Sequence, residues 1–156
     1  MTITLESIKA DADALAAKIA TFEAQAATIP AFFLPEATIE LAQGEHYAGL
    51  IIGKDGEPSY HLILLPGDAE SLTWDKAQAW ANGQGGELPT RREQPLLFAN
   101  LKECFESTWY WSNQQHEKES GWAWYQDFFN GLQYDKRKSN ELRARAVRRV
   151  IVKGEK

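Results

Sequence analysis

Apolar residues in the first thirty positions recur at alternating spacings of three and four. One heptad core position holds Leu5, Ala12, Ile19 and Ala26, and the other holds Ile8, Leu15, Phe22 and Ile29. This spacing predicts a helix over residues 1–30 that ends at Pro30. The unbroken register favours self-association. Two features argue against self-association: alanines alternate with large residues at one core position, and Lys18–Glu23 is the one evident charged pair between flanking positions. The alternative is therefore a helix that packs on the chain's own domain.

Residues 31–156 carry the pattern of a second, mixed domain. Strand-like runs at residues 38–41, 46–52 and 59–65 are separated by turn residues, among them Lys54-Asp55-Gly56. Thr73 resembles an N-cap, and it predicts a helix that ends at Asn82-Gly83. Its buried face is expected to hold Ala77, Trp80 and Ala81.

A second helix is predicted by a capping box, Thr90-x-x-Glu93. Apolar residues then share one broad face: Leu96, Leu97, Leu101, Cys104 and Phe105. Beyond Phe105 the pattern changes to strands at residues 108–112, 123–129 and 143–152.

Two Trp-x-Trp pairs lie in these strands, Trp109 with Trp111 and Trp122 with Trp124. Because successive strand residues alternate faces, each pair predicts two indoles on one face, and their size favours a core role. Polar side chains in segments expected to be irregular accompany them: Asn113, Gln114, Gln115, Asn130, Gln133, Tyr134, Asp135 and Asn140. Polar loops on a rigid frame predict a binding surface.

Composition narrows the function. A net charge of −5 and a pI near 5.2 argue against nucleic-acid binding, which needs a basic face. A single cysteine, Cys104, allows no intramolecular disulfide, as expected for a reducing compartment. Neither a secretion signal nor an apolar run of about 20 residues is visible, so neither export nor membrane insertion is expected.

Four motifs in the second half stand in a recognisable order: G-G-x-L-P-T-R-x-E-Q, W-Y-W-S, A-W-x-Q-x-F-x-x-G and R-A-R-A-V-R-R. In this order they resemble a family of phage and bacterial domains related to the C-terminal domain of the Legionella collagen-like adhesin. The resemblance implies an α+β, C-type lectin-like fold with two helices and a twisted antiparallel sheet. Here that domain would follow the N-terminal heptad helix.

The resemblance also connects the chain to formylglycine-generating enzymes, which oxidise through cysteines bound to copper. One cysteine cannot supply that pair. Ser112, His116 and Asp127 could be combined into a triad, but no strained nucleophile elbow accompanies them. The Glu-Pro-Asn and Trp-Asn-Asp motifs of calcium-dependent lectins do not occur either. We therefore expect no catalysis, no metal and no cofactor.

In the phage relatives, variable ligand-binding positions follow the second and third motifs, and some members are diversified by retroelements. Carried over, these positions are Gln114, Gln115, Trp122, Tyr125, Asp127, Phe129, Asn130, Leu132, Tyr134, Asp135 and Lys136. Tyr125, Asn130 and Tyr134 are expected to be exposed, with Trp109, Trp111 and Trp124 as scaffold.

The resemblance implies a virion protein assembled in the bacterial cytoplasm, either a tail-fibre or a receptor-binding component. We expect it to form a homo-oligomer, with a trimer favoured, and to bind a host-surface protein or glycan. The alternatives are a capsid or baseplate decoration protein that binds other virion subunits, and an intracellular phage protein that binds a host factor.

Overall fold

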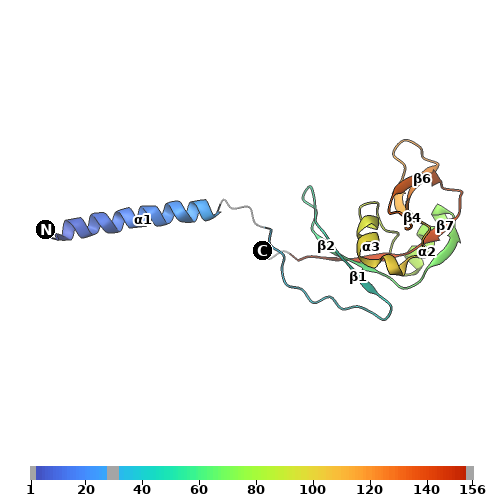
Figure 1. Ribbon diagram of the computed structural model, residues 1–156, viewed down its shortest axis with the longest axis horizontal. Helices are drawn as coiled ribbons and strands as arrows, with labels where there is room; N and C mark the ends of the chain where they lie inside the picture. Colours follow the sequence, from blue (N-terminus) through green and yellow to red (C-terminus); the bar gives the residue numbers. More distant parts are fainter. Residues whose placement is uncertain (1–2, 28–31, 154–156) are drawn as a thin grey trace. The chain divides into compact units, whose positions relative to one another are not determined.

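The computed structural model describes residues 3–27 and 32–153 and divides the chain into two compact units, Met1–Glu36 and Ala37–Lys156. The fold is mixed α+β, with three α-helices and two sheets among the described residues (Figure 1).

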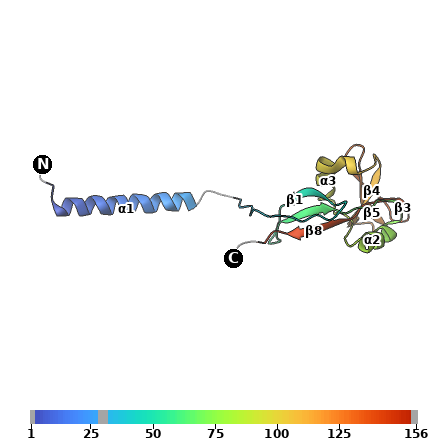
Figure 2. The same ribbon diagram turned by 90° about the horizontal axis from the view of Figure 1, so that it is seen from below.

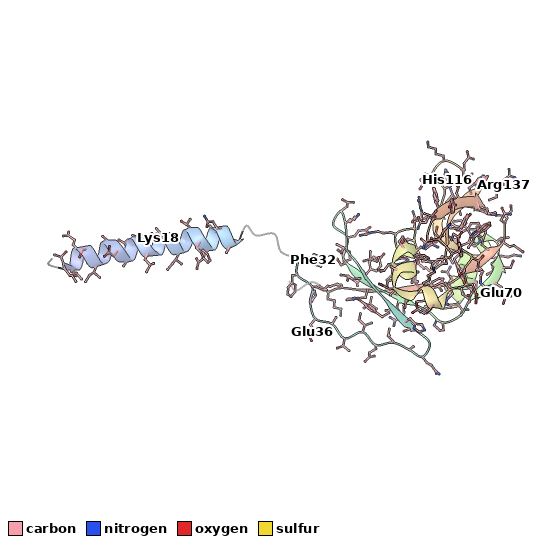
Figure 3. The ribbon with its side chains drawn as sticks, in the orientation of Figure 1. Lys18, Phe32, Glu36, Glu70, His116 and Arg137 are labelled. Atoms are coloured by element: carbon pink, nitrogen blue, oxygen red, sulfur yellow. The ribbon has the colours of Figure 1, made fainter. Side chains whose placement is uncertain are left out.

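The first unit contains the predicted helix, α1, over Leu5–Ala27. Thr4 and Ser7 cap it reciprocally, because each backbone N–H donates to the hydroxyl of the other residue at 3.2 Å. None of the described helix residues is buried, and side chains project from α1 along its length (Figure 3). The predicted core residue Ile29 lies outside the described residues.

The second unit holds the remaining elements. Its strands are β1 (His46–Ile51), β2 (Tyr60–Leu64), β3 (Ala69–Leu72), β4 (Trp109–Gln115), β5 (Trp122–Asp127), β6 (Gln133–Arg137), β7 (Leu142–Ala144) and β8 (Val147–Ile151). Its helices are α2 (Trp74–Gly83), α3 (Gln94–Leu101) and a short 3₁₀ turn, η1 (Lys102–Cys104).

The strands form two sheets rather than the single antiparallel sheet that we expected. One has the order β1-β2-β8, and the other has the order β3-β7-β4-β5-β6. Neighbours are antiparallel except β4 and β7, which pair in parallel. The β4–β6 strands carry most of the predicted ligand residues.

Two apolar clusters hold the domain together, and each includes residues of one helix. The first contains Trp74, Ala77 and Ala81 of α2 with Trp111 of β4, while the second contains Leu97 and Leu101 of α3 with Tyr110 of β4. Figure 2 shows α2 and α3 on opposite sides of β4 and β5. The middle of β4 is therefore buried on both faces, which explains why Tyr110 and Trp111 are consecutive large aromatic residues.

The predicted start of α2 is confirmed, whereas α3 begins at Gln94, one turn after the predicted N-cap Thr90. The Thr90 backbone N–H donates to the Glu93 carboxylate at 2.8 Å, and the Glu93 N–H donates to the Thr90 hydroxyl at 3.2 Å, which is the predicted capping box. Thr73 occupies the N-cap of α2, although no side-chain cap hydrogen bond forms there. The apolar face continues past Leu101, but through η1 rather than as α-helix.

Several strand predictions are wrong. Residues 38–41 form no strand, although Arg148 donates to the Glu40 carbonyl at 3.0 Å. The predicted strand at 143–152 is two strands, because the chain leaves one sheet for the other at Arg145-Ala146. The strand β3 was not predicted at all.

The polar segments are also more regular than the sequence indicates. Asn113, Gln114 and Gln115 continue β4, and Gln133, Tyr134 and Asp135 belong to β6. Pairing with β5 supplies the backbone hydrogen bonds that make β6 a strand, despite its polar composition.

Glu93 connects the start of α3 to strands β2 and β8 of the three-stranded sheet. Its side chain is fully buried, accepts from the Tyr60 hydroxyl at 2.7 Å and forms a two-point ion pair with Arg149. Burial alone would raise the pKa of Glu93, but the hydrogen bonds from Arg149 and Tyr60 outweigh it and hold the pKa below 4.5. Burial and the Glu93 carboxylate raise the pKa of Tyr60 to about 12.

A second ion pair, between Glu45 and Arg148, gives a prediction for acid stability. The Arg148 hydrogen bond lowers the pKa of Glu45 from 4.5 to about 2. Because the folded-state pKa is depressed, the pair stabilises the domain fully above pH 4.5, and this contribution is lost as the pH falls towards 2. Thermal melts of Glu45→Gln and the parent should differ at pH 7 and converge towards pH 2. A constant difference across that range would contradict this assignment.

Candidate functional site

The strand register divides the predicted binding residues between two faces of the β4–β6 sheet. Directly paired residues share a face, and the pairs Trp109↔Asp127 and Tyr125↔Tyr134 lie on the face towards α2. The Tyr125 ring lies 5.2 Å from the Trp109 ring and 5.9 Å from the Tyr134 ring, measured between centroids. Three aromatic side chains from three strands thus form one continuous group.

The turn between β5 and β6 extends this group with further apolar side chains. The Asp127 carboxylate accepts from the Phe129 N–H at 2.8 Å, and the Asn130 side chain accepts from the Leu132 N–H at 2.9 Å. Such side-chain bonds to the backbone fix a tight turn. Phe128 faces inward and is buried, whereas Phe129 faces solvent.

Four large side chains on or beside this hairpin are exposed, and we call them the hairpin surface: Trp109 (39% exposed), Phe129 (70%), Leu132 (54%) and Tyr134 (42%). Tyr125 lies beneath them at 7% exposure, and burial raises its pKa. Exposed apolar side chains gathered on one hairpin are typical of an interaction site.

Charged groups surround the exposed Trp109 ring. The Lys136 ammonium lies 4.1 Å from its centroid, and the indole N–H donates to Asp127 at 3.2 Å. Trp109 also lines a shallow pocket of about 190 Å³ together with Glu70, Thr108, Glu141, Leu142 and Arg143. The indole therefore combines apolar contact with polar groups at its edge.

The opposite face of the same strands is occupied by the chain's own side chains. The Arg91 guanidinium lies 3.5 Å from the centroid of the Trp124 ring, and His116 stacks on that ring at 5.3 Å. The Trp124 indole N–H donates to Glu117 at 3.2 Å. Figure 3 shows His116 and Arg137 at the β6 end of the domain. These contacts leave less of Trp124 available to a ligand than of Trp109.

The structure brings together six of the eleven predicted ligand residues: Asp127, Phe129, Asn130, Leu132, Tyr134 and Lys136. Trp122 and Asp135 lie on the other face with Arg137 and Trp124. The Gln114 side chain accepts from the Arg91 backbone N–H at 2.8 Å, and Gln115 accepts from Lys138 at 2.6 Å.

Two expectations about exposure are wrong. Tyr125 is buried, because its strand position points into the α2 cluster. Trp109, expected to be buried scaffold, is 39% exposed, because it begins β4 beyond the cover of α2. Trp111 is fully buried as expected. No sequence signal separated Trp109 from Trp111, since both lie within the strand predicted over residues 108–112.

The considered triad is not assembled. Ser112 is fully buried and its hydroxyl accepts from the Gln114 N–H at 3.2 Å, while His116 Nδ1 accepts from the backbone N–H groups of Lys118 and Glu119. Among the described residues, no hydrogen bond joins Ser112, His116 and Asp127 to one another. Cys104 is half-buried, and burial raises its pKa, which makes its thiol less reactive.

Within residues 3–27 and 32–153, no group of three or more His, Cys, Asp or Glu side chains is arranged to hold a metal ion. In the same part of the chain, the helices lack the combination of length and apolar character that crossing a membrane requires. No protein-family model matches the chain, and no curated protein matches it.

Proposed function

We propose that this chain is a non-enzymatic binding protein whose hairpin surface contacts a protein or glycan ligand. One observation carries the proposal: Trp109, Phe129, Leu132 and Tyr134 are all exposed on or beside the β5–β6 hairpin, next to the buried aromatic residues Tyr110, Trp111 and Phe128. Aromatic side chains give large contacts at low entropic cost, and Asn130 and Asp127 beside them add hydrogen-bonding groups.

The origin that we propose is a phage or prophage virion, with the domain as a tail-fibre or receptor-binding component of C-type lectin-like fold. This rests on the motif order in the second half of the chain, and the mixed α+β architecture agrees with it at a coarser level. The exposed apolar stripe of α1 supports self-association, which would multiply weak contacts through avidity.

The first test replaces the most exposed aromatic residues of the hairpin surface. Phe129→Ala and Tyr134→Ala are each expected to weaken binding of the labelled full-length protein to host cells by about tenfold, as hot-spot aromatics do. Their melting temperatures should stay close to the parent's, because both side chains are largely exposed. Cell binding is measured by fluorescence titration.

The matched control is Arg137→Ala, which changes the same strand on the opposite face and should bind like the parent. If all variants bind like the parent, the ligand surface lies elsewhere. If the parent binds no cells but binds virions that lack this protein, the decoration role replaces receptor binding.

A further inference from the structure

The two core positions of α1 differ in size in a regular way. The first position alternates large and small residues, Leu5, Ala12, Ile19 and Ala26, whereas the second holds the large residues Ile8, Leu15 and Phe22 within the helix. The large members are between 49% and 71% exposed, so α1 by itself does not cover them. Most helical stability in proteins comes from packing of an apolar face, so this stripe needs a partner.

The alternation discriminates between the two orientations of a partner helix. In a parallel coiled coil each core residue meets its own copy, so Ala12 would meet Ala12 and Ala26 would meet Ala26. Such layers leave unfilled volume, which is costly in a core. In an antiparallel pair the first position of one helix faces the second position of the other. Ala12 would then face a large residue, so that a small and a large side chain share its layer.

We infer that α1 pairs antiparallel with α1 of a second copy of this chain, with Ala12 facing Leu15 of that copy. The same register places Ile8 opposite Ile19 and Leu5 opposite Phe22, and each of these contacts occurs twice. The pairing buries the large apolar residues that the described structure leaves exposed.

Charges beside the core support this register. In the antiparallel pair, equivalent flanking positions face each other, which sets Asp11 against Lys18 of the second copy, twice. In a parallel coil Asp11 would instead face the uncharged Ala16, and Lys18 would face Glu23. Asp11 therefore contributes to pairing in the antiparallel arrangement alone.

This orientation determines what the assembly can do. The C-terminal ends of the two helices would lie roughly 40 Å apart, at 1.5 Å per residue, so the two domains would leave from opposite ends. Such a dimer bridges two ligands, whereas a parallel trimer gathers its domains at one end. The bridging role rests on the proposed function, but the helix pairing does not.

A charge exchange tests the pairing in the full-length chain. Asp11→Lys alone sets lysine against lysine, and Lys18→Asp alone sets aspartate against aspartate, so each variant should dimerise about tenfold more weakly. In an equimolar mixture, opposite charges face at both contacts of the mixed dimer, and the affinity should return to that of the parent. The double variant Asp11→Lys/Lys18→Asp should be restored as well. Sedimentation equilibrium at low salt measures the association, and circular dichroism checks that α1 stays helical.

The outcomes separate the models. A dimeric parent, two weakened variants and a restored mixture support antiparallel pairing. A monomeric or trimeric parent overturns antiparallel pairing. So does a second result, in which Asp11→Lys associates like the parent, Lys18→Asp associates more weakly, and mixing the two variants does not restore the affinity. None of these variants changes the hairpin surface. The cell-binding test of Tyr134→Ala can therefore fail while the pairing of α1 is confirmed, and the reverse also holds.

Discussion

Trp111→Ala is expected to lower the free energy of unfolding by about 3–5 kcal/mol. The indole is fully buried in the α2 cluster, and its N–H donates to the Leu72 carbonyl at 2.8 Å. Removing it leaves a cavity and an unpaired carbonyl. The melting temperature should fall by roughly 10–15 °C, which differential scanning calorimetry measures.

Trp109→Ala is the matched control, because it removes the same side chain two residues earlier in the same strand. That indole is 39% exposed, so the expected loss of unfolding free energy is about 1 kcal/mol. The same variant should weaken ligand binding, whereas Trp111→Phe should keep binding intact. Equal destabilisation by the two alanine variants would contradict the assignment of Trp109 to the hairpin surface.

Glu93→Ala is expected to cost about 3–5 kcal/mol of unfolding free energy, because it breaks a buried ion pair from one side. The substitution leaves Arg149 without its buried partner and the Tyr60 hydroxyl without its acceptor, and it removes half of the capping box. Urea denaturation at pH 7 measures the loss.

Glu87→Ala provides the control for Glu93, since it removes the other carboxylate that binds Arg149. The Glu87 side chain is 54% exposed, and exposed ion pairs contribute only about 0–1 kcal/mol. If the Glu87 variant is as unstable as the Glu93 variant, the number of carboxylates beside Arg149, rather than the burial of Glu93, determines the stability of this contact.

The predicted helices agree with the structure more closely than the predicted strands, for a physical reason. Helix signals are local: the heptad of α1 and the capping box of Thr90 and Glu93 lie within a few residues of the groups that they satisfy. Strand signals depend on partners far along the chain. The polar strand β6 forms because β5 supplies its hydrogen bonds, and β3 forms because β7 lies beside it.

The candidate site shows the same division. Four of the ligand positions that the resemblance implies, Asp127, Phe129, Asn130 and Leu132, lie close together because they belong to one turn between two strands. It did not separate Tyr134 from Asp135 by face, or Tyr125 from Trp109 by burial, since those distinctions depend on the register with β4 and on the position of α2.

The sequence by itself therefore determined that the chain begins with a heptad helix, continues as a mixed α+β domain and carries its aromatic residues in late strands. These properties follow from periodicity and side-chain type, which act over a few neighbouring residues. Only the tertiary structure decided that Trp111 is core and Trp109 is surface. Burial depends on which distant elements cover a strand, and here α2 covers Trp111 while β4 begins at Trp109, beyond that cover.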